Sequence, residues 1–139
     1  SDEAIDERVA ECLRMVDLDG TEEKLPAQLS GGQRKRAGFA RAIATRPKYM
    51  LYDEPTTGLD PVTTAVIDEL IVRMSDELGV TGVVITHDMK SAFRISDRIA
   101  MLYDGRIRFD GTPDELRACE DPLVRGFVEG RPELMEQVR

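Results

Sequence analysis

The first third of the chain alternates between apolar and charged positions at helical spacing. Residues 4–18 predict a helix whose apolar face carries Ile5, Val9, Cys12, Leu13 and Val16. Asp19-Gly20 ends it, and a polar loop with Pro26 follows. Residues 30–46 predict a second helix, because Ala37, Ala40, Ile43 and Ala44 form an apolar stripe before Arg46-Pro47. The pattern therefore predicts two amphipathic helices in succession.

Two later apolar runs have the pattern of strands in a parallel sheet. Residues 49–52 are apolar or aromatic and stop at Asp53 and Glu54. Residues 82–86 predict a fully buried strand, which is followed by His87, the one histidine of the chain. Between the runs, residues 61–78 carry the broad apolar face of a third helix that begins at Asp60-Pro61 and ends at Gly79. Strand, helix and strand in this order predict an α/β fold.

The last third of the chain predicts a hairpin and short helices. Residues 99–103 and 106–109 predict two strands joined by Asp104-Gly105, a pair suited to a type I′ turn. Thr112 and Glu115 form a capping-box pattern around Pro113, which indicates a helix start. Leu123, Phe127 and Val128 suggest one more short helix, and the polar tail from Arg131 is expected to fray.

The composition of the chain limits the kinds of partner that it is expected to bind. The chain has 139 residues, 41% of them hydrophobic and 33% charged, and a net charge of −8. No apolar run approaches the ~20 residues that a membrane helix needs. The negative charge argues against nucleic acid as a partner, because nonspecific nucleic-acid binding requires a basic face. Cys12 and Cys119 match no metal-ligand spacing and are interpreted as packed or idle thiols.

The pair Asp53-Glu54 is the first candidate for chemistry. It follows a strand and precedes the turn Pro55 to Gly58, and ligand-binding groups of α/β sheets gather at such strand ends. One carboxylate there can hold hydrated Mg²⁺, while the other orients and deprotonates a water for attack on a phosphoryl group. Taken alone, the pair is more simply an acidic strand end followed by a solvated turn.

The start of the second helix, Ser30-Gly31-Gly32-Gln33, is the second candidate. Ser30 and Gln33 also fit a capping box, which would explain those two residues structurally. The box does not explain two adjacent glycines, each of which costs a helix about 1 kcal/mol relative to alanine. Glycine leaves the first-turn N–H groups uncovered, so a phosphate can approach the positive end of the helix dipole. We therefore expect an anion site, with weak reinforcement from the basic run 34–36.

These stretches together resemble the motifs of ABC-type ATPases. Leu29 to Gln33 resembles the signature motif, and residues 51–54 resemble the Walker B segment. The resemblance implies that Asp53 orders Mg²⁺ and that Glu54 is the general base. It also implies that Gly58-Leu59-Asp60 is the D-loop at a dimer contact. His87, within Ile85-Thr86-His87-Asp88, corresponds to the switch histidine that contacts the γ-phosphate.

The resemblance covers nearly the whole chain but only the C-terminal part of the family's P-loop ATPase domain. It implies that residues 1–46 are later helices of the helical subdomain and that residues 47–103 are the second half of the ATPase core. Residues 104–139 would be a C-terminal hairpin, short helices and tail. No Gly-x-x-x-x-Gly-Lys-Ser/Thr loop occurs in the 139 residues, so this chain by itself is expected to be inactive.

The resemblance also implies partners. A second ATPase subunit would pair head to tail, so that Ser30, Gly31, Gly32 and Gln33 close over ATP held by the other subunit. A multi-span membrane permease would be driven by this closure from the cytoplasmic face of the cell membrane, with a lipid- or solute-binding subunit as a further partner. Residues 33–42 and 111–130 look like the ATPases of Mla-type phospholipid transport systems, although many of those have Met where this chain has Gln33.

Importers of amino acids or other small solutes are the alternative, because they carry Gln at that position. Two further classes remain open from sequence: a soluble ABC ATPase of DNA repair or translation, and a non-catalytic interaction module.

Overall fold

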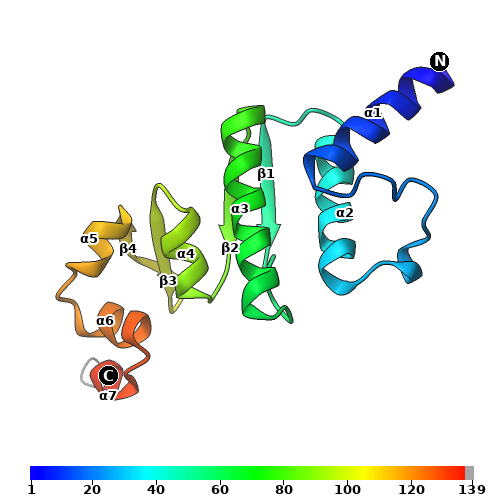
Figure 1. Cartoon of the computed structure of the whole chain (residues 1–139). Coiled ribbons are helices and arrows are strands. Elements are labelled where there is room, and N and C mark those ends of the chain that lie inside the picture. Colours follow the sequence, from blue (N-terminus) through cyan, green and yellow to red (C-terminus); the bar gives the residue numbers. More distant parts are fainter. Residues whose placement is uncertain (137–139) are drawn as a thin grey trace. The chain divides into compact units, whose positions relative to one another are not determined.

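A computed structural model of the protein describes residues 1–136, and the chain divides into two compact units, Ser1–His87 and Asp88–Arg139. The first unit contains α1 (Asp2–Met15), the 3₁₀ turn η1 (Pro26–Gln28), α2 (Gly31–Ile43), β1 (Tyr49–Asp53), α3 (Pro61–Leu78) and β2 (Thr81–Ile85) (Figure 1). The second contains α4 (Met89–Ile95), β3 (Ile99–Tyr103), β4 (Arg106–Gly111), α5 (Pro113–Arg117), α6 (Pro122–Glu129) and α7 (Pro132–Met135). The two predicted N-terminal helices are confirmed, with α1 beginning and ending earlier than expected and α2 ending three residues earlier.

Helices α1 and α2 cap each other through arginines. Arg8 of α1 donates through Nη2 to Ile43 O at 2.6 Å and through Nε to Ala44 O at 3.2 Å. In return, Arg36 of α2 donates through Nη1 to the carbonyl oxygens of Val16 and Asp17. The last carbonyls of a helix lack intrahelical partners and carry the negative end of its dipole. Each guanidinium therefore satisfies the open end of the other helix.

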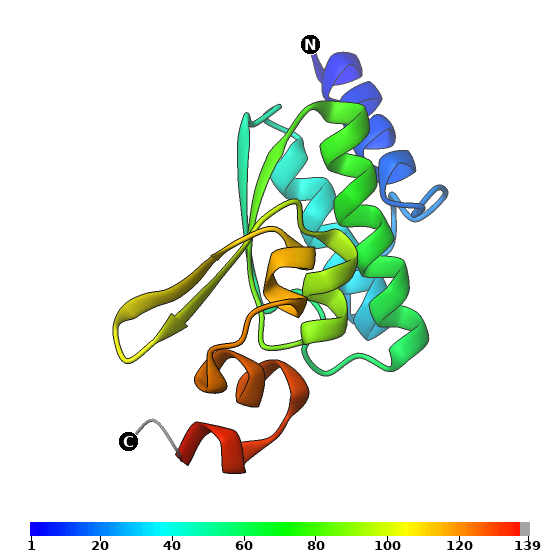
Figure 2. The same cartoon turned by 90° about the vertical axis from the view of Figure 1, so that its left-hand side faces the viewer.

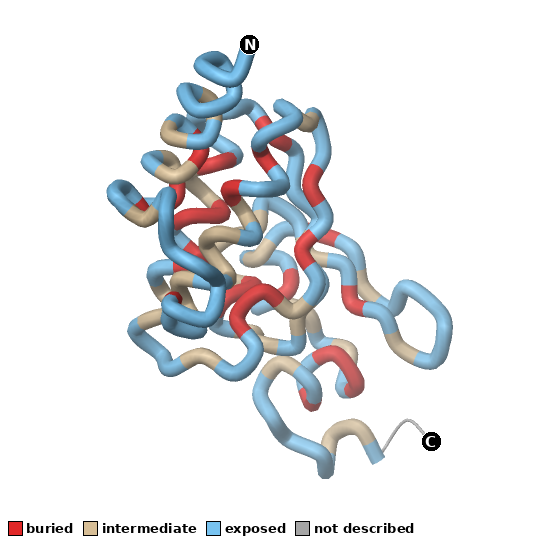
Figure 3. The backbone as a smooth tube through the Cα atoms, turned by 90° about the vertical axis from the view of Figure 1, so that its right-hand side faces the viewer, coloured by how far each residue is buried: buried red, intermediate tan, exposed pale blue. Residues whose placement is uncertain are grey.

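Helix α3 provides the core against which the other elements of the first unit pack. Ile67, Leu70, Ile71 and Met74 are buried along it, and buried segments are red in Figure 3. The helix contacts α2 and β2 (Figure 2). Arg73 reaches from α3 to the end of α1, where it donates to Met15 O at 2.7 Å and to Asp17 Oδ2 at 2.8 Å. The buried face of α3 and this arginine thus hold α1 and α2 beside the strands. None of the helices within residues 1–136 has the length and apolar composition needed to span a bilayer.

Strands β1 and β2 pair in parallel, with Leu51 opposite Val83 and Asp53 opposite Ile85. The predicted pairing is confirmed, but the predicted full burial of the second strand is wrong. Met50 and Tyr52 are buried, whereas Leu51 is 82% exposed and Val83 is 50% exposed. Within the described structure α3 covers one face of the two strands, so alternate side chains on the opposite face meet solvent. A parallel sheet normally has both faces covered.

The second unit is built on the predicted hairpin. β3 and β4 pair antiparallel, and Asp104 and Gly105 both have positive φ, at 47° and 71°, as a type I′ turn requires. The second strand extends to Gly111, two residues beyond the prediction. Met101 of the hairpin packs in one buried cluster with Leu116, Leu123 and Val124 of the following helices. The capping box of Thr112 and Glu115 at the start of α5 is confirmed.

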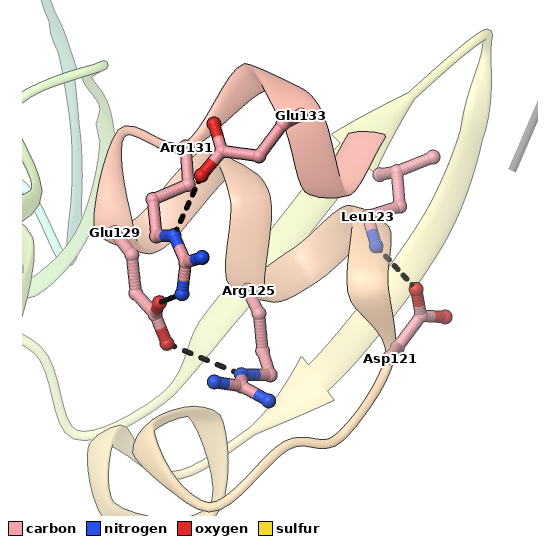
Figure 4. Close-up of polar contacts among 6 residues, drawn as sticks. All are labelled: Asp121, Leu123, Arg125, Glu129, Arg131 and Glu133. Atoms are coloured by element: carbon pink, nitrogen blue, oxygen red, sulfur yellow. Dashed lines mark hydrogen bonds and ion pairs between the residues drawn. The ribbon is translucent and has the colours of Figure 1, made fainter. Parts of the chain in front are cut away.

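The C-terminal segment is more ordered than its composition suggested. Asp121 caps α6 by accepting from Leu123 N, and Glu129 near the helix end pairs with Arg125 and Arg131 (Figure 4). Residues 132–135 then form α7, and Met135 packs against the buried cluster of this unit. Residues 132–135 are thus helical and anchored by an apolar side chain in this structure, and fraying of the polar tail stays a prediction. Residues 137–139 lie outside the described residues.

The exposed apolar face of β1 and β2 leads to a prediction about association. This 139-residue chain, purified alone, is expected to self-associate, because exposed strands with apolar side chains tend to pair with other chains. Leu51→Lys places a charge at the centre of that face and is expected to shift the chain toward monomer in analytical ultracentrifugation.

Leu25→Lys is the matched control, because Leu25 is 67% exposed in a loop away from the strands. Equal self-association of Leu51→Lys and the parent chain would contradict the role given to this face.

Candidate functional site

Glu54 lies one residue beyond the end of β1, in a backbone conformation that few glutamates adopt. Its φ is +47°, in the left-handed region that favours glycine. Its N–H donates to Ile85 O of the neighbouring strand at 2.9 Å, and its carbonyl accepts from Thr57 N at 3.3 Å. The sheet ladder and the following turn thus hold the residue from both sides. Strain of this kind is kept where surrounding contacts determine the backbone, and it clusters at functional sites.

The carboxylate of Glu54 is held by two side chains. His87 Nδ1 lies 2.9 Å from Oε1, and Thr57 Oγ1 donates to Oε2 at 3.0 Å. The hydrogen bond with His87 is the largest effect and lowers the pKa of Glu54 below its usual value. Desolvation has a smaller effect that raises this pKa, and the hydrogen bond from Thr57 lowers it further. The side chain is 35% exposed, so water reaches it. Glu54 is therefore an ionised, oriented and accessible carboxylate.

His87 follows β2 directly and is 74% exposed. Its contact with Glu54 fits a ring that carries a proton on Nδ1, since an ionised carboxylate can only accept. Nε2 of that ring is then an acceptor when the ring is neutral and a donor when it is doubly protonated. The predicted meeting of residues 54 and 87 at one end of the sheet is observed.

Asp53 is the last residue of β1, and it is exposed. Residues 1–136 contain no cluster of three or more His, Cys, Asp or Glu side chains arranged to hold a metal ion. Mg²⁺ in nucleotide sites does not need such a cluster, because it keeps several waters and binds one or two carboxylates together with phosphate oxygens. A single exposed carboxylate beside Glu54 fits that donor set.

A groove of about 410 Å³ brings together the second group of predicted residues. Its lining comes from the start of α2 and from the turn that leads into α3, and it includes Ser30, Gly31, Gly32, Gln33, Gly58 and Asp60. The two motifs lie 25 residues or more apart in sequence, and the sequence alone did not predict that they adjoin. The groove thus places the signature-like and D-loop-like residues on one surface.

Ser30 and Gln33 form the capping box that was their structural alternative. Gln33 N donates to Ser30 Oγ at 3.2 Å, and Ser30 N donates to Gln33 Oε1 at 2.9 Å. Both side chains use only acceptor atoms in these bonds. The hydroxyl proton of Ser30 and the amide protons of Gln33 are left for another acceptor. Capping and anion binding are therefore compatible in these two residues.

The two glycines differ in their surroundings. A Cβ added at Gly31 would meet nothing within 4 Å, so this position is open to solvent. A Cβ added at Gly32 would lie 2.7 Å from Thr63 Cγ2 of α3. Thr63 is fixed there, because its hydroxyl donates to Asp60, the N-cap of α3. Gly31 fits the predicted approach of a phosphate, whereas Gly32 is also required by the close approach of two helices.

Asp60 is the N-cap of α3 and accepts from the N–H groups of Val62 and Thr63. The hydroxyl of Thr63 is the largest cause that lowers the pKa of Asp60, followed by these backbone donors. The side chain is thus committed to the helix start in this structure, which is the structural role that the sequence also allowed. A contact across a dimer remains a proposal.

The basic run 34–36 contacts the backbone in this structure, and its expected reinforcement of anion binding stays a prediction. Arg34 Nη1 donates to Leu29 O at 2.6 Å, Lys35 Nζ to Glu54 O at 3.3 Å, and Arg36 to the end of α1. All three cations donate to backbone carbonyls, and Arg36 also lines the groove. Two residues that contact Glu54 were missed from the sequence. Thr57 follows Glu54 by three residues in a turn, where local side-chain hydrogen bonds are common. No sequence signal indicated that Lys35 would contact Glu54.

Comparison with known proteins finds similarity to one protein family. The family model described as ABC transporter matches residues 1–57. The methionine import ATP-binding protein MetN of Xylella fastidiosa is 47% identical over 129 residues, which are 92% of this chain and 38% of that protein. The chain thus spans well under half of this relative's length.

Solved structures agree with the sequence comparison. CbiO1 of Clostridium perfringens, described as part of the ABC transporter complex cbiONQ, matches with a TM-score of 0.80 and 31% identity over 99% of this chain and 55% of its own. The ATP-binding cassette MJ0796, solved as a post-hydrolysis dimer bound to ADP and Pi, matches with a TM-score of 0.69 and 38% identity over 81% of this chain and 49% of its own. The fold is that of part of an ABC ATPase domain, and the chain is similar over most of its length to ATP-binding subunits of ABC transporters.

Proposed function

We propose that the full-length protein hydrolyses ATP in a head-to-tail dimer and thereby drives a membrane importer for an amino acid or another small solute. The observation that carries the proposal is Glu54, held with its carboxylate ionised beside His87 at the carboxyl end of a parallel sheet. MJ0796 was solved with ADP and Pi as a dimer, and this supports nucleotide chemistry and pairing here.

The comparisons support import of a small solute better than lipid transport. The relative in Xylella fastidiosa is named for methionine import, and it matches 92% of this chain. Gln33 agrees with this choice, since it is the residue that set the sequence apart from many Mla-type ATPases. The similarity of residues 111–130 to that group is thus better explained by shared descent within the wider family. Neither the lipid nor a lipid-binding subunit is part of the proposal.

In the proposed mechanism, Glu54 accepts a proton from the attacking water. Thr57 and His87 orient its two oxygens, so the carboxylate faces solvent in a fixed direction before a nucleotide arrives. Mg²⁺ held through water at Asp53 would supply charge neutralisation to the phosphate oxygens. His87 can donate from Nε2 to a phosphate oxygen while it holds Glu54 through Nδ1 only when doubly protonated.

In the same proposal, the groove of Ser30 to Gln33 and Asp60 faces the nucleotide of a partner subunit. The Ser30 hydroxyl, the Gln33 amide and the first-turn N–H groups of α2 donate toward phosphate at the positive end of the helix. The 139 residues contain no phosphate-binding glycine loop, and in this proposal the loop that holds the nucleotide facing the groove belongs to the partner subunit. The permease holds the subunit at the cytoplasmic face of the membrane.

The first prediction concerns the general base. Glu54→Gln in the full-length protein is expected to leave ATP binding intact and to lower kcat by about 10²-fold or more, because the amide cannot accept a proton. In cells, uptake of labelled amino acid should stop while phospholipid transport is unchanged. Turnover close to that of the parent protein would remove Glu54 from its assigned role, and loss of phospholipid transport alone would reverse the choice of substrate class.

The second prediction concerns the groove. Gly31→Asp is expected to abolish ATP-dependent dimerisation, measured by size exclusion, because it sets a carboxylate where a phosphate must meet the start of α2. Gly31→Ala is the matched control, since the structure has open space for its Cβ, and it should dimerise almost normally. A substitution at position 31 tests the effect of the added charge without a steric clash, whereas any side chain at position 32 would clash with Thr63. Normal dimerisation of Gly31→Asp would leave residues 30–33 as a helix cap only.

A further inference from the structure

Lys35 connects two parts of the site that the proposed function uses separately. It lies on α2, four residues after Gly31, and therefore one helical turn beyond it on the same helix face. Its Nζ donates to the backbone carbonyl of Glu54 at 3.3 Å, across 19 residues of sequence. The side chain is half-buried between these elements. It is the one member of the basic run that reaches the strand end.

The backbone of Glu54 has a conformation that needs outside support. Its carbonyl receives two donors, Thr57 N and Lys35 Nζ, and its N–H is held by Ile85 O. Thr57 belongs to the same turn and moves with it, whereas Ile85 and Lys35 belong to other elements. Removal of the ammonium leaves the carbonyl side of a left-handed residue held only by its own turn. The direction of the carboxylate depends on that backbone, because it projects from the same Cα.

We propose that Lys35 is a positioning residue, which ties the helix bearing the signature-like residues to the backbone of Glu54. The inference rests on the proposed function, in which Glu54 acts on the subunit's own ATP and residues 30–33 contact the partner's ATP. A helix is rigid over one turn, so displacement of Gly31 by a phosphate would be transmitted to Lys35 and on to the carbonyl of Glu54. Lys35 thus provides a direct contact between the two nucleotide sites.

The test compares Lys35→Met and Lys35→Arg in the full-length protein. Methionine keeps an unbranched apolar stem that is one atom shorter and removes the donors, whereas arginine keeps a donor and the charge. Lys35→Met is expected to lower kcat by about tenfold through misplacement of Glu54, with KM for ATP and ATP-dependent dimerisation unchanged. Lys35→Arg should recover most of kcat. Lys24→Met, which removes the same charge from an exposed loop, should behave as the parent protein.

The possible results separate clearly. An unchanged kcat for Lys35→Met would overturn the inference. A loss confined to KM or to dimerisation would also overturn it, because a lysine that contacts phosphate or only supports the fold would change those quantities instead of kcat. An equal loss in Lys35→Arg would also overturn it. If Glu54→Gln keeps its turnover, the proposed function itself fails. If Glu54→Gln is inactive and Lys35→Met is fully active, the proposed function stands and only the role given to Lys35 fails.

Discussion

The hydrogen bond from Glu54 N to Ile85 O is the interaction on which the site depends. It continues the ladder of β1 and β2 by one residue and holds Glu54 where the strand ends, at a residue with a left-handed backbone conformation. From that point the carboxylate can meet His87, which follows β2, and Thr57, which follows in the turn. Without parallel pairing in this register, the two motifs would not share an end of the sheet. The chemistry of the site is therefore a consequence of strand register.

The second constraint is the close approach of α2 and α3. Gly32 has no side chain where Thr63 packs, and Thr63 is fixed by the same Asp60 that begins α3. The signature-like residues and the D-loop-like turn adjoin because of this packing. Arg8 and Arg36, which each donate to carbonyls at the end of the other's helix, hold the outer helices in the same arrangement. Residues assigned to nucleotide contacts are thus also the residues that place the helices.

Much of this could be predicted from the sequence because it rests on local patterns. Helical periodicity, Asp60-Pro61, Asp104-Gly105 and the capping boxes each lie within a few residues, and the structure reproduces them. The same locality explains the errors. An apolar run such as 82–86 predicts a strand but not which elements pack on its two faces, so the exposure of Val83 was not predicted. The contact of Lys35 with Glu54 was not predicted, because its partner is a carbonyl distant in sequence.

The dependence of kcat on pH in the full-length protein tests the account of Glu54 most directly. A general base works only when ionised, and His87 and Thr57 lower the pKa of Glu54, so activity should persist to a pH below the usual value for a glutamate. Thr57→Val removes one hydrogen bond to the ionised form, so it should raise that pKa and move the acid limb of the profile upward. An acid limb that stays in place in Thr57→Val would contradict the account.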